Sequence, residues 1–149
     1  MTELDKTLMS LTNTLVHVAR AYKAAADRMA GDFDLSHASA WPVVMIARLG
    51  DGVRPGLLAD ALGVEPPSLV RIVDQLVTAA LVVRQDDAGD RRAKTLHLTE
   101  DGKSCAARLE KALVPFRREL FKGVPEAEAE TCVRVLMQLD QVLAQQSKR

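Results

Sequence analysis

One stretch of the sequence, residues 66–79, carries polar side chains at helical spacing, opposite an apolar face. Ser68, Arg71 and Gln75 share the polar face, and Pro67 stands at its start. The guanidinium of Arg71 is a rigid fork of donors that suits guanine O6 and N7 or a phosphate. Ser68 is short enough to reach a phosphate or a base edge near the helix start. This face is therefore a candidate DNA-contacting surface, and the alternative is a polar face that only meets water.

A second group of charged residues follows at positions 90–94, where Arg91, Arg92 and Lys94 lie beside Asp90. A narrow minor groove attracts arginine through its enhanced negative potential. We expect Arg92 to enter the minor groove, with Asp90 fixing its rotamer by a charge-assisted hydrogen bond. Arg91 and Lys94 are expected nearer to phosphates. The alternative is a loop whose charges are simply solvated.

Both groups need elements that hold them in place, and the sequence predicts a helix-turn-helix followed by a hairpin. Two short helices, at 55–62 and 66–79, each begin at proline, and Gly63 lies in the turn between them. Two strand-like segments follow at 81–84 and 95–98, separated by an acidic turn that contains one glycine. A hairpin directly after a helix-turn-helix indicates the winged form of that motif.

The first and last predicted helices carry apolar stripes that suit a partner subunit. Over residues 4–29 the apolar side chains step by four and three positions, a heptad-like seam of the kind that meets other helices. Because this seam begins almost at the N-terminus, where one small domain has little left to cover it, we favour a partner chain over an intrachain core. The stripe residues are Leu4, Leu8, Leu11, Leu15, Val18 and Tyr22 in the first helix, and Cys132, Val135, Leu136, Leu139, Val142 and Leu143 in the last, at 126–146.

Two further helices complete the predicted fold. Ser36 is placed to cap a helix over 37–49. Thr99 is placed to cap a long helix that runs to about Phe121, with a bend or interruption at Pro115. The fold class is therefore mainly α with a small β-hairpin.

Length and charge limit the function. The 149 residues, 48% of them hydrophobic, fit one domain over 1–149 and exclude wholesale disorder. Within it we assign the winged helix-turn-helix to 37–98 and dimerisation helices to 1–30 and 115–149. Because 20 Lys+Arg balance 20 Asp+Glu, the chain does not coat nucleic acid by bulk attraction. With no basic apolar leader and no long apolar run, we expect a cytoplasmic protein without a membrane span.

Enzyme chemistry is the weakest interpretation. The sequence shows no nucleophile–base pair, no glycine-rich phosphate loop and no metal-ligand spacing among its three histidines. Cys105 and Cys132 are far apart and are expected to be ordinary buried or half-buried thiols. We therefore expect no metal and no cofactor.

Two strings resemble the MarR family of winged helix-turn-helix regulators, and its SlyA branch in particular. VEPPSLVRIVDQL at 64–76 is very similar to that branch's recognition helix. DRRAKTLHLTEDG at 90–102 is similar to its wing tip, second wing strand and next helix start. With the element order, the resemblance covers nearly the whole chain. It implies a transcriptional regulator, most often a repressor, that binds double-stranded DNA as a homodimer, with recognition helices about one DNA turn apart on a pseudo-palindromic site.

The resemblance also assigns roles to single residues. Ser68 and Arg71 match recognition-helix contacts, and Asp90 and Arg92 match the wing pair. One departure concerns the turn before the first wing strand, where Ala80 stands in place of the family's usual glycine. If that turn keeps a left-handed backbone, alanine costs about 1 kcal/mol more than glycine there.

Many members of the family release DNA when a small aromatic or lipophilic effector binds between the winged domain and the dimerising helices. By resemblance, the residues that would line such a pocket are Arg20, Tyr22, His37, Trp41 and Met45. Arg20 would pair a ligand carboxylate or form a surface ion pair, and Trp41 would contact the ligand or fill the core. Peroxide sensing of the family's kind is not expected, because the first cysteine is Cys105 rather than one near the N-terminus.

The balanced charge also motivates a competing hypothesis, a winged-helix module for protein–protein contact without specific DNA binding. Residues 61–98 hold five Lys/Arg and five Asp/Glu, so even this part has no basic excess. If it does read DNA, a few placed cations must supply the affinity, namely Arg71, Arg91, Arg92 and Lys94. Binding to bulk DNA should then be modest.

Overall fold

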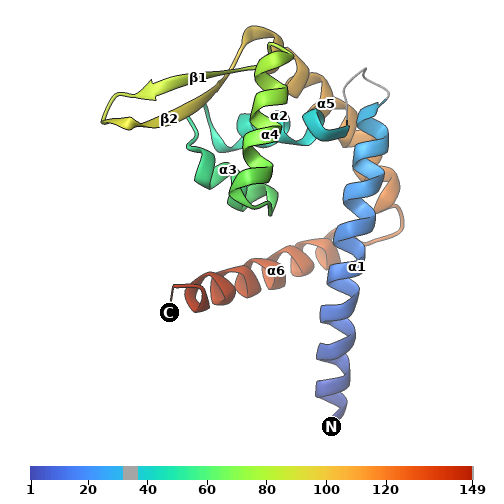
Figure 1. Ribbon diagram of the computed structural model, residues 1–149. Coiled ribbons are helices and arrows are strands. Elements are labelled where there is room, and N and C mark those ends of the chain that lie inside the picture. Colours follow the sequence, from blue (N-terminus) through green and yellow to red (C-terminus); the bar gives the residue numbers. More distant parts are fainter. Residues whose placement is uncertain (32–36, 149) are drawn as a thin grey trace. The chain divides into compact units, whose positions relative to one another are not determined.

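The computed structural model describes residues 1–31 and 37–148, with six helices and one hairpin in these ranges (Figure 1). The chain forms two compact units, residues 1–113 and 114–149, which we describe separately. The predicted fold class, mainly helical with a small hairpin, is confirmed. Ser36 lies outside the described residues. The elements are α1 (Glu3–Gly31), α2 (His37–Leu49), α3 (Pro55–Leu62), α4 (Pro66–Thr78), β1 (Val82–Asp87), β2 (Asp90–Leu98), α5 (Glu100–Leu120) and α6 (Glu126–Gln146).

The helix-turn-helix packs on the main core of the first unit. Leu58 of α3 and Leu76 of α4 are completely buried, together with Ile46 of α2. Gly63 ends α3 in the left-handed conformation, with φ 65°, and its amide donates to the Asp60 carbonyl. The turn therefore directs α4 away from α3 at a fixed angle. The other buried members of this core are Val43, Val53, Ala59, Leu69, Val73, Leu81, Val82, Leu96, Leu98 and Ala106.

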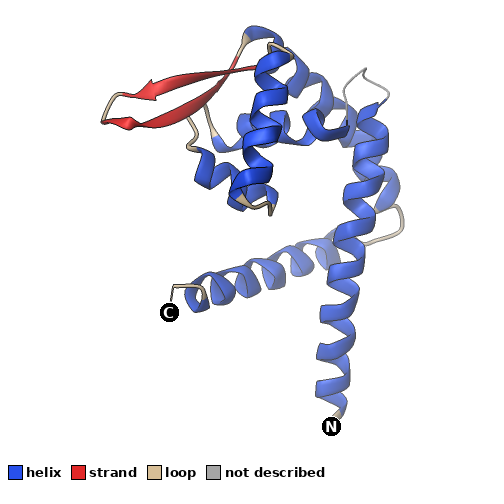
Figure 2. Cartoon of the chain, viewed as in Figure 1, coloured by secondary structure: helices blue, strands red, loops and turns tan. Residues whose placement is uncertain are grey.

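The hairpin is antiparallel and projects from the helices of the first unit (Figure 2). Its base belongs to the core, because Leu96 and Leu98 are buried there. Val53 adds a single bridge to the sheet, in which its carbonyl accepts from the Leu96 amide at 2.8 Å. Strand pairing is regular as far as the Asp86–Lys94 pair and then shifts between Asp86 and Asp87. The base is thus held firmly, whereas the tip departs from the ladder.

The junction between α4 and the hairpin keeps the left-handed turn, with Ala80 at φ 58°. The Ala80 amide donates to the Val77 carbonyl and the Leu81 amide to the Leu76 carbonyl, both at 3.0 Å. These two bonds form a Schellman motif, which is normally closed by glycine. Thr99 joins this turn to α5, because its Oγ1 donates to the Ala80 carbonyl at 2.6 Å and accepts from the Gly102 amide at 3.0 Å. The predicted capping role of Thr99 is confirmed.

A second cluster joins the end of α1 to the first unit. Ala30 of α1 is buried with Ala40 and Val44 of α2 and with Leu109 of α5. The N-terminal half of α1, in contrast, is exposed along almost its whole length. Helix α5 continues through Pro115, so the expected interruption there is absent.

The second unit contains the end of α5 and all of α6. No residue of α6 is buried in this chain. Its apolar stripe is largely open to solvent, as the exposure of Val135, Leu136, Val142 and Leu143 shows.

Candidate nucleic-acid interface

Helix α4 presents the predicted polar face to solvent. Pro66 and Pro67 occupy its first positions, where a missing backbone N–H costs nothing. Leu69, Val73 and Leu76 bury the opposite face and so fix the rotation of the helix about its axis. As a result Pro67, Ser68, Arg71 and Gln75 are all exposed on one continuous surface.

Val70 also lies at the edge of this surface, and its side chain is 56% exposed. We did not single it out from the sequence, because an apolar residue in α4 was expected on the core side. Its position three residues from Val73 and one from Arg71 places it between the two faces. An exposed valine there suits apolar contact with a thymine methyl group in a major groove.

The hairpin tip is shaped by aspartate side chains that bond backbone amides. Oδ1 of Asp87 accepts from the Gly89 amide, and Oδ1 of Asp90 accepts from the Arg92 amide, each at 3.0 Å. The expected bond between Asp90 and the Arg92 guanidinium is not found among the described residues. Asp90 therefore fixes the backbone at Arg92 and leaves its side chain free to point outward, because both of these residues are exposed.

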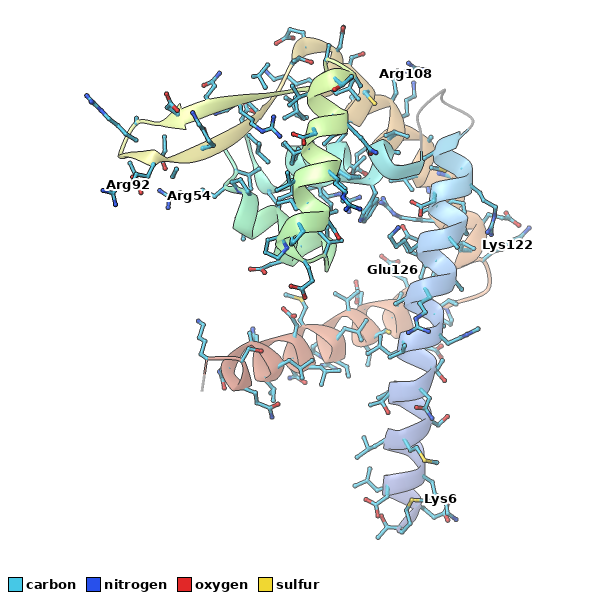
Figure 3. The ribbon with its side chains drawn as sticks, viewed as in Figure 1. Lys6, Arg54, Arg92, Arg108, Lys122 and Glu126 are labelled. Atoms are coloured by element: carbon cyan, nitrogen blue, oxygen red, sulfur yellow. The ribbon has the colours of Figure 1, made fainter. Side chains whose placement is uncertain are left out.

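Three cations around the hairpin are neutralised by specific acids (Figure 3). Lys94 pairs with Asp86 across the two strands. Arg84 of β1 pairs with Asp74 of α4. These pairs correct the expectation for Lys94, since its ammonium lies on a carboxylate and is not a free phosphate donor in this state.

The third ion pair joins residues that are far apart in the sequence. Nη2 of Arg54, at the start of α3, lies 2.5 Å from Oδ2 of Asp87 at the hairpin tip. Sequence reasoning missed Arg54 altogether, because nothing local relates it to a residue 33 positions away.

The remaining cations of residues 54–98 form no ion pair within the described chain. They are Arg71 on the exposed face of α4 and the adjacent pair Arg91 and Arg92 at the tip of the hairpin. The balanced charge of this part therefore conceals an uneven placement. Half of its cations are paired internally, and the other half stand on the two surfaces predicted to meet DNA.

The pKa of the Asp87 carboxyl is lowered from its ordinary value. The main cause is the hydrogen bond from the Gly89 amide, followed by the hydrogen bond from Arg54, since both favour the charged form. Asp87 is thus ionised, and the pair with Arg54 is intact, throughout the neutral range.

The predicted effector residues are not brought together around one cavity in the described chain. Trp41 is half-buried and stacks under the Arg48 guanidinium, 5.1 Å from the ring centroid. It lines a cavity of only about 10 Å³, room for one water at most. Met45 packs against the other core cluster, and Arg20 is exposed on α1. Tyr22 is half-buried, and the side chain of His37 lies outside the described residues.

The two cysteines differ in environment. Cys105 is half-buried in α5, and desolvation raises the pKa of its thiol, which the nearby Arg108 only partly offsets. Cys132 is exposed on α6. Within the described residues, no three His, Cys, Asp or Glu side chains gather as a metal site. None of the described helices is long and apolar enough to span a membrane.

A helix-turn-helix with an exposed polar second helix, followed by a hairpin with unpaired arginines at its tip, defines the winged-helix class of DNA-binding proteins. A family model described as the MarR family matches residues 33–93. The transcriptional regulator PA3341 is 34% identical and superposes with a TM-score of 0.80, over 93% of this chain and 99% of that one. The chain therefore belongs to the MarR family of transcriptional regulators, as predicted, and is not an enzyme.

Two more distant structures share the fold. The transcriptional regulator SlyA is 17% identical, with a TM-score of 0.78 over 91% of this chain and 94% of that one. A MarR family regulator from Listeria monocytogenes, in complex with a 26mer DNA, is 19% identical, with a TM-score of 0.79 over 90% of this chain and 89% of that one.

Proposed function

We propose that this regulator acts as a homodimeric, sequence-specific repressor on a pseudo-palindromic operator. In this proposal α4 lies in the major groove and the tip of the hairpin reaches the adjacent minor groove. The observation that carries the proposal is the placement of Arg71, Arg91 and Arg92, the cations of residues 54–98 that lack an ion-pair partner in the described chain. The Listeria relative, whose structure contains DNA, gives further support.

The role of Arg71 is tested by its substitution with alanine. If Arg71 reads a guanine, Arg71→Ala lowers specific binding by about 1–3 kcal/mol and leaves non-specific binding almost unchanged. Fluorescence anisotropy with the gene's own upstream region and a scrambled duplex separates the two. An equal loss on both duplexes makes Arg71 a phosphate contact.

The role of the hairpin tip is tested by the salt dependence of binding. Arg92→Ala should reduce affinity and flatten the plot of log K against log salt, because fewer counterions are released. An unchanged slope contradicts the minor-groove role. Absence of any protected DNA at low salt contradicts the whole proposal and favours the protein–protein module.

The homodimer is supported by apolar surface that the chain leaves uncovered. On α1, Leu4, Leu8 and Leu11 are between 47% and 64% exposed. The exposed stripe of α6 adds to this surface, and such surface on a single chain is typical of subunit interfaces. Analytical ultracentrifugation should give a dimer for the native chain, and Leu8→Asp/Leu11→Asp should shift it toward monomer.

The proposed regulation is a population shift caused by a small aromatic or lipophilic effector. An effector that prefers a dimer with the wrong spacing of the two α4 helices weakens DNA binding by its differential affinity for the two states. Because the cavity at Trp41 is too small for such a molecule, we propose that the effector site forms only in the dimer. A panel of aromatic acids added to the anisotropy assay tests this.

A further inference from the structure

The hairpin that carries Arg91 and Arg92 is attached firmly only at its base. Leu96 and Leu98 are buried, and Val53 bridges to Leu96, so the last part of β2 is part of the core. Toward the tip the side chains are exposed, and strand pairing shifts between Asp86 and Asp87. Backbone hydrogen bonds alone therefore leave the direction of the tip weakly determined.

The ion pairs of the hairpin contribute unequally to its direction. Lys94 and Asp86 both belong to the hairpin, so their pair does not connect it to the body of the first unit. The pair of Arg84 with Asp74 connects β1 to α4, three residues before the tip turn. Among the described ion pairs, only Arg54–Asp87 connects the tip turn itself to the body.

Both partners of this pair have fixed backbones. The Arg54 carbonyl accepts from the amides of Leu57 and Leu58 at the start of α3, at 3.1 and 3.2 Å. Val53, directly before Arg54, is 5% exposed. At the other end, Oδ1 of Asp87 closes the tip turn through the Gly89 amide, and Oδ2 is left for Arg54. The Asp87 side chain is 20% exposed, against 61% for Arg54.

From this geometry we propose that Arg54 is a positioning residue for DNA binding, which acts through Asp87 to hold the hairpin tip in the direction that the minor-groove contact needs. Figure 3 shows Arg54 beneath the hairpin and Arg92 near its tip. The inference rests on the proposed function of Arg92. Pre-setting the tip removes the cost of ordering it at the moment of binding.

A direct phosphate contact by Arg54 is the alternative, and the sign of one substitution separates the two. Asp87→Asn removes the negative charge but keeps a side-chain oxygen for the Gly89 amide. If Arg54 simply contacts phosphate, this change frees a cation, removes an acid and strengthens binding. If Arg54 positions the tip through Asp87, the same change weakens binding.

The experiment measures operator affinity and its salt slope for Arg54→Ala, Asp87→Asn and the double variant, with thermal unfolding as a folding check. We expect each single variant to lose about tenfold in affinity, since each of the two hairpins of the dimer loses about threefold, the range of an exposed ion pair. The double variant should be no weaker than either single one, because they break the same contact. Arg54→Lys should recover part of the loss.

Lys122→Ala is the matched control, since it removes an exposed cation that pairs with Glu119 in the second unit and should leave affinity unchanged. Hydroxyl-radical footprints should lose protection at the hairpin and keep it at α4, a pattern that a general loss of stability does not produce. Stronger or unchanged binding by Asp87→Asn overturns the inference. If Arg92→Ala also binds like the native chain, the minor-groove role fails first, and the positioning role fails with it.

Discussion

Replacing Ala80 with glycine should stabilise the protein, and the size of the gain follows from one backbone angle. Ala80 has φ 58°, and the left-handed region costs an L-residue about 1–2 kcal/mol. Glycine removes that strain but gives the unfolded chain more freedom, which costs about 0.5–1 kcal/mol. The net gain is about 0.5–1 kcal/mol, which raises the melting temperature by roughly 1–4 °C for a chain of this length.

The assay is urea unfolding followed by circular dichroism, at one protein concentration because a dimer's midpoint depends on it. The urea midpoint of Ala80→Gly should rise with no change in the m-value. Ala79→Gly is the matched control, because Ala79 ends the same helix at φ −77° and its replacement relieves no strain. That control should lose about 0.5–1 kcal/mol, the ordinary cost of glycine. Equal losses for both variants would show that the left-handed alanine is not strained.

Three further predictions concern residues outside the proposed contacts. Gly102→Ala should cost at least about 2 kcal/mol in urea unfolding, because a Cβ there would lie 2.1 Å from the Leu81 carbonyl oxygen; a loss below about 1 kcal/mol refutes this packing. The Asp87 carboxyl should titrate below an ordinary aspartate in carbon-detected NMR, and Arg54→Ala should raise its midpoint. Because the folded pKa is the lower one, the stability from this group is complete above the unfolded pKa and is lost as the pH falls through the folded pKa. Cys105 should react with maleimide at pH 7 more slowly than glutathione, since its thiolate is scarce; equal rates would contradict the raised pKa.

The boundaries of the helices were predictable because proline and glycine mark them in the sequence. Prolines at 55 and 66 begin α3 and α4, and Gly63 ends α3, as the sequence indicates. The exposed face of α4 was predictable for the same kind of reason, because helical spacing assigns each residue to a side. The exception is Pro115, which the helix accommodates without interruption.

The charge partners could not be predicted, because they depend on tertiary distance rather than spacing. Arg54 and Asp87 meet only after the helix-turn-helix and the hairpin have both folded. The partner of Lys94 depends on strand register, and that register shifts one residue later at the tip. Asp90 was expected to bond a guanidinium, but the tight turn brings the Arg92 amide within its reach instead. In each case the sequence identifies the charged residues and leaves their pairing open.

The measurement that tests the account most directly is a footprint on an operator selected by the purified native protein from random duplex DNA. The account predicts two half-sites with centres about 10 base pairs apart, each protected in the major groove and flanked by minor-groove protection. It also predicts that methylation of guanine N7 in each half-site interferes with binding, and that Arg71→Ala abolishes this interference. Selection of no common sequence, or protection that Arg71→Ala and Arg92→Ala leave intact, would contradict the claim that α4 and the hairpin tip read DNA.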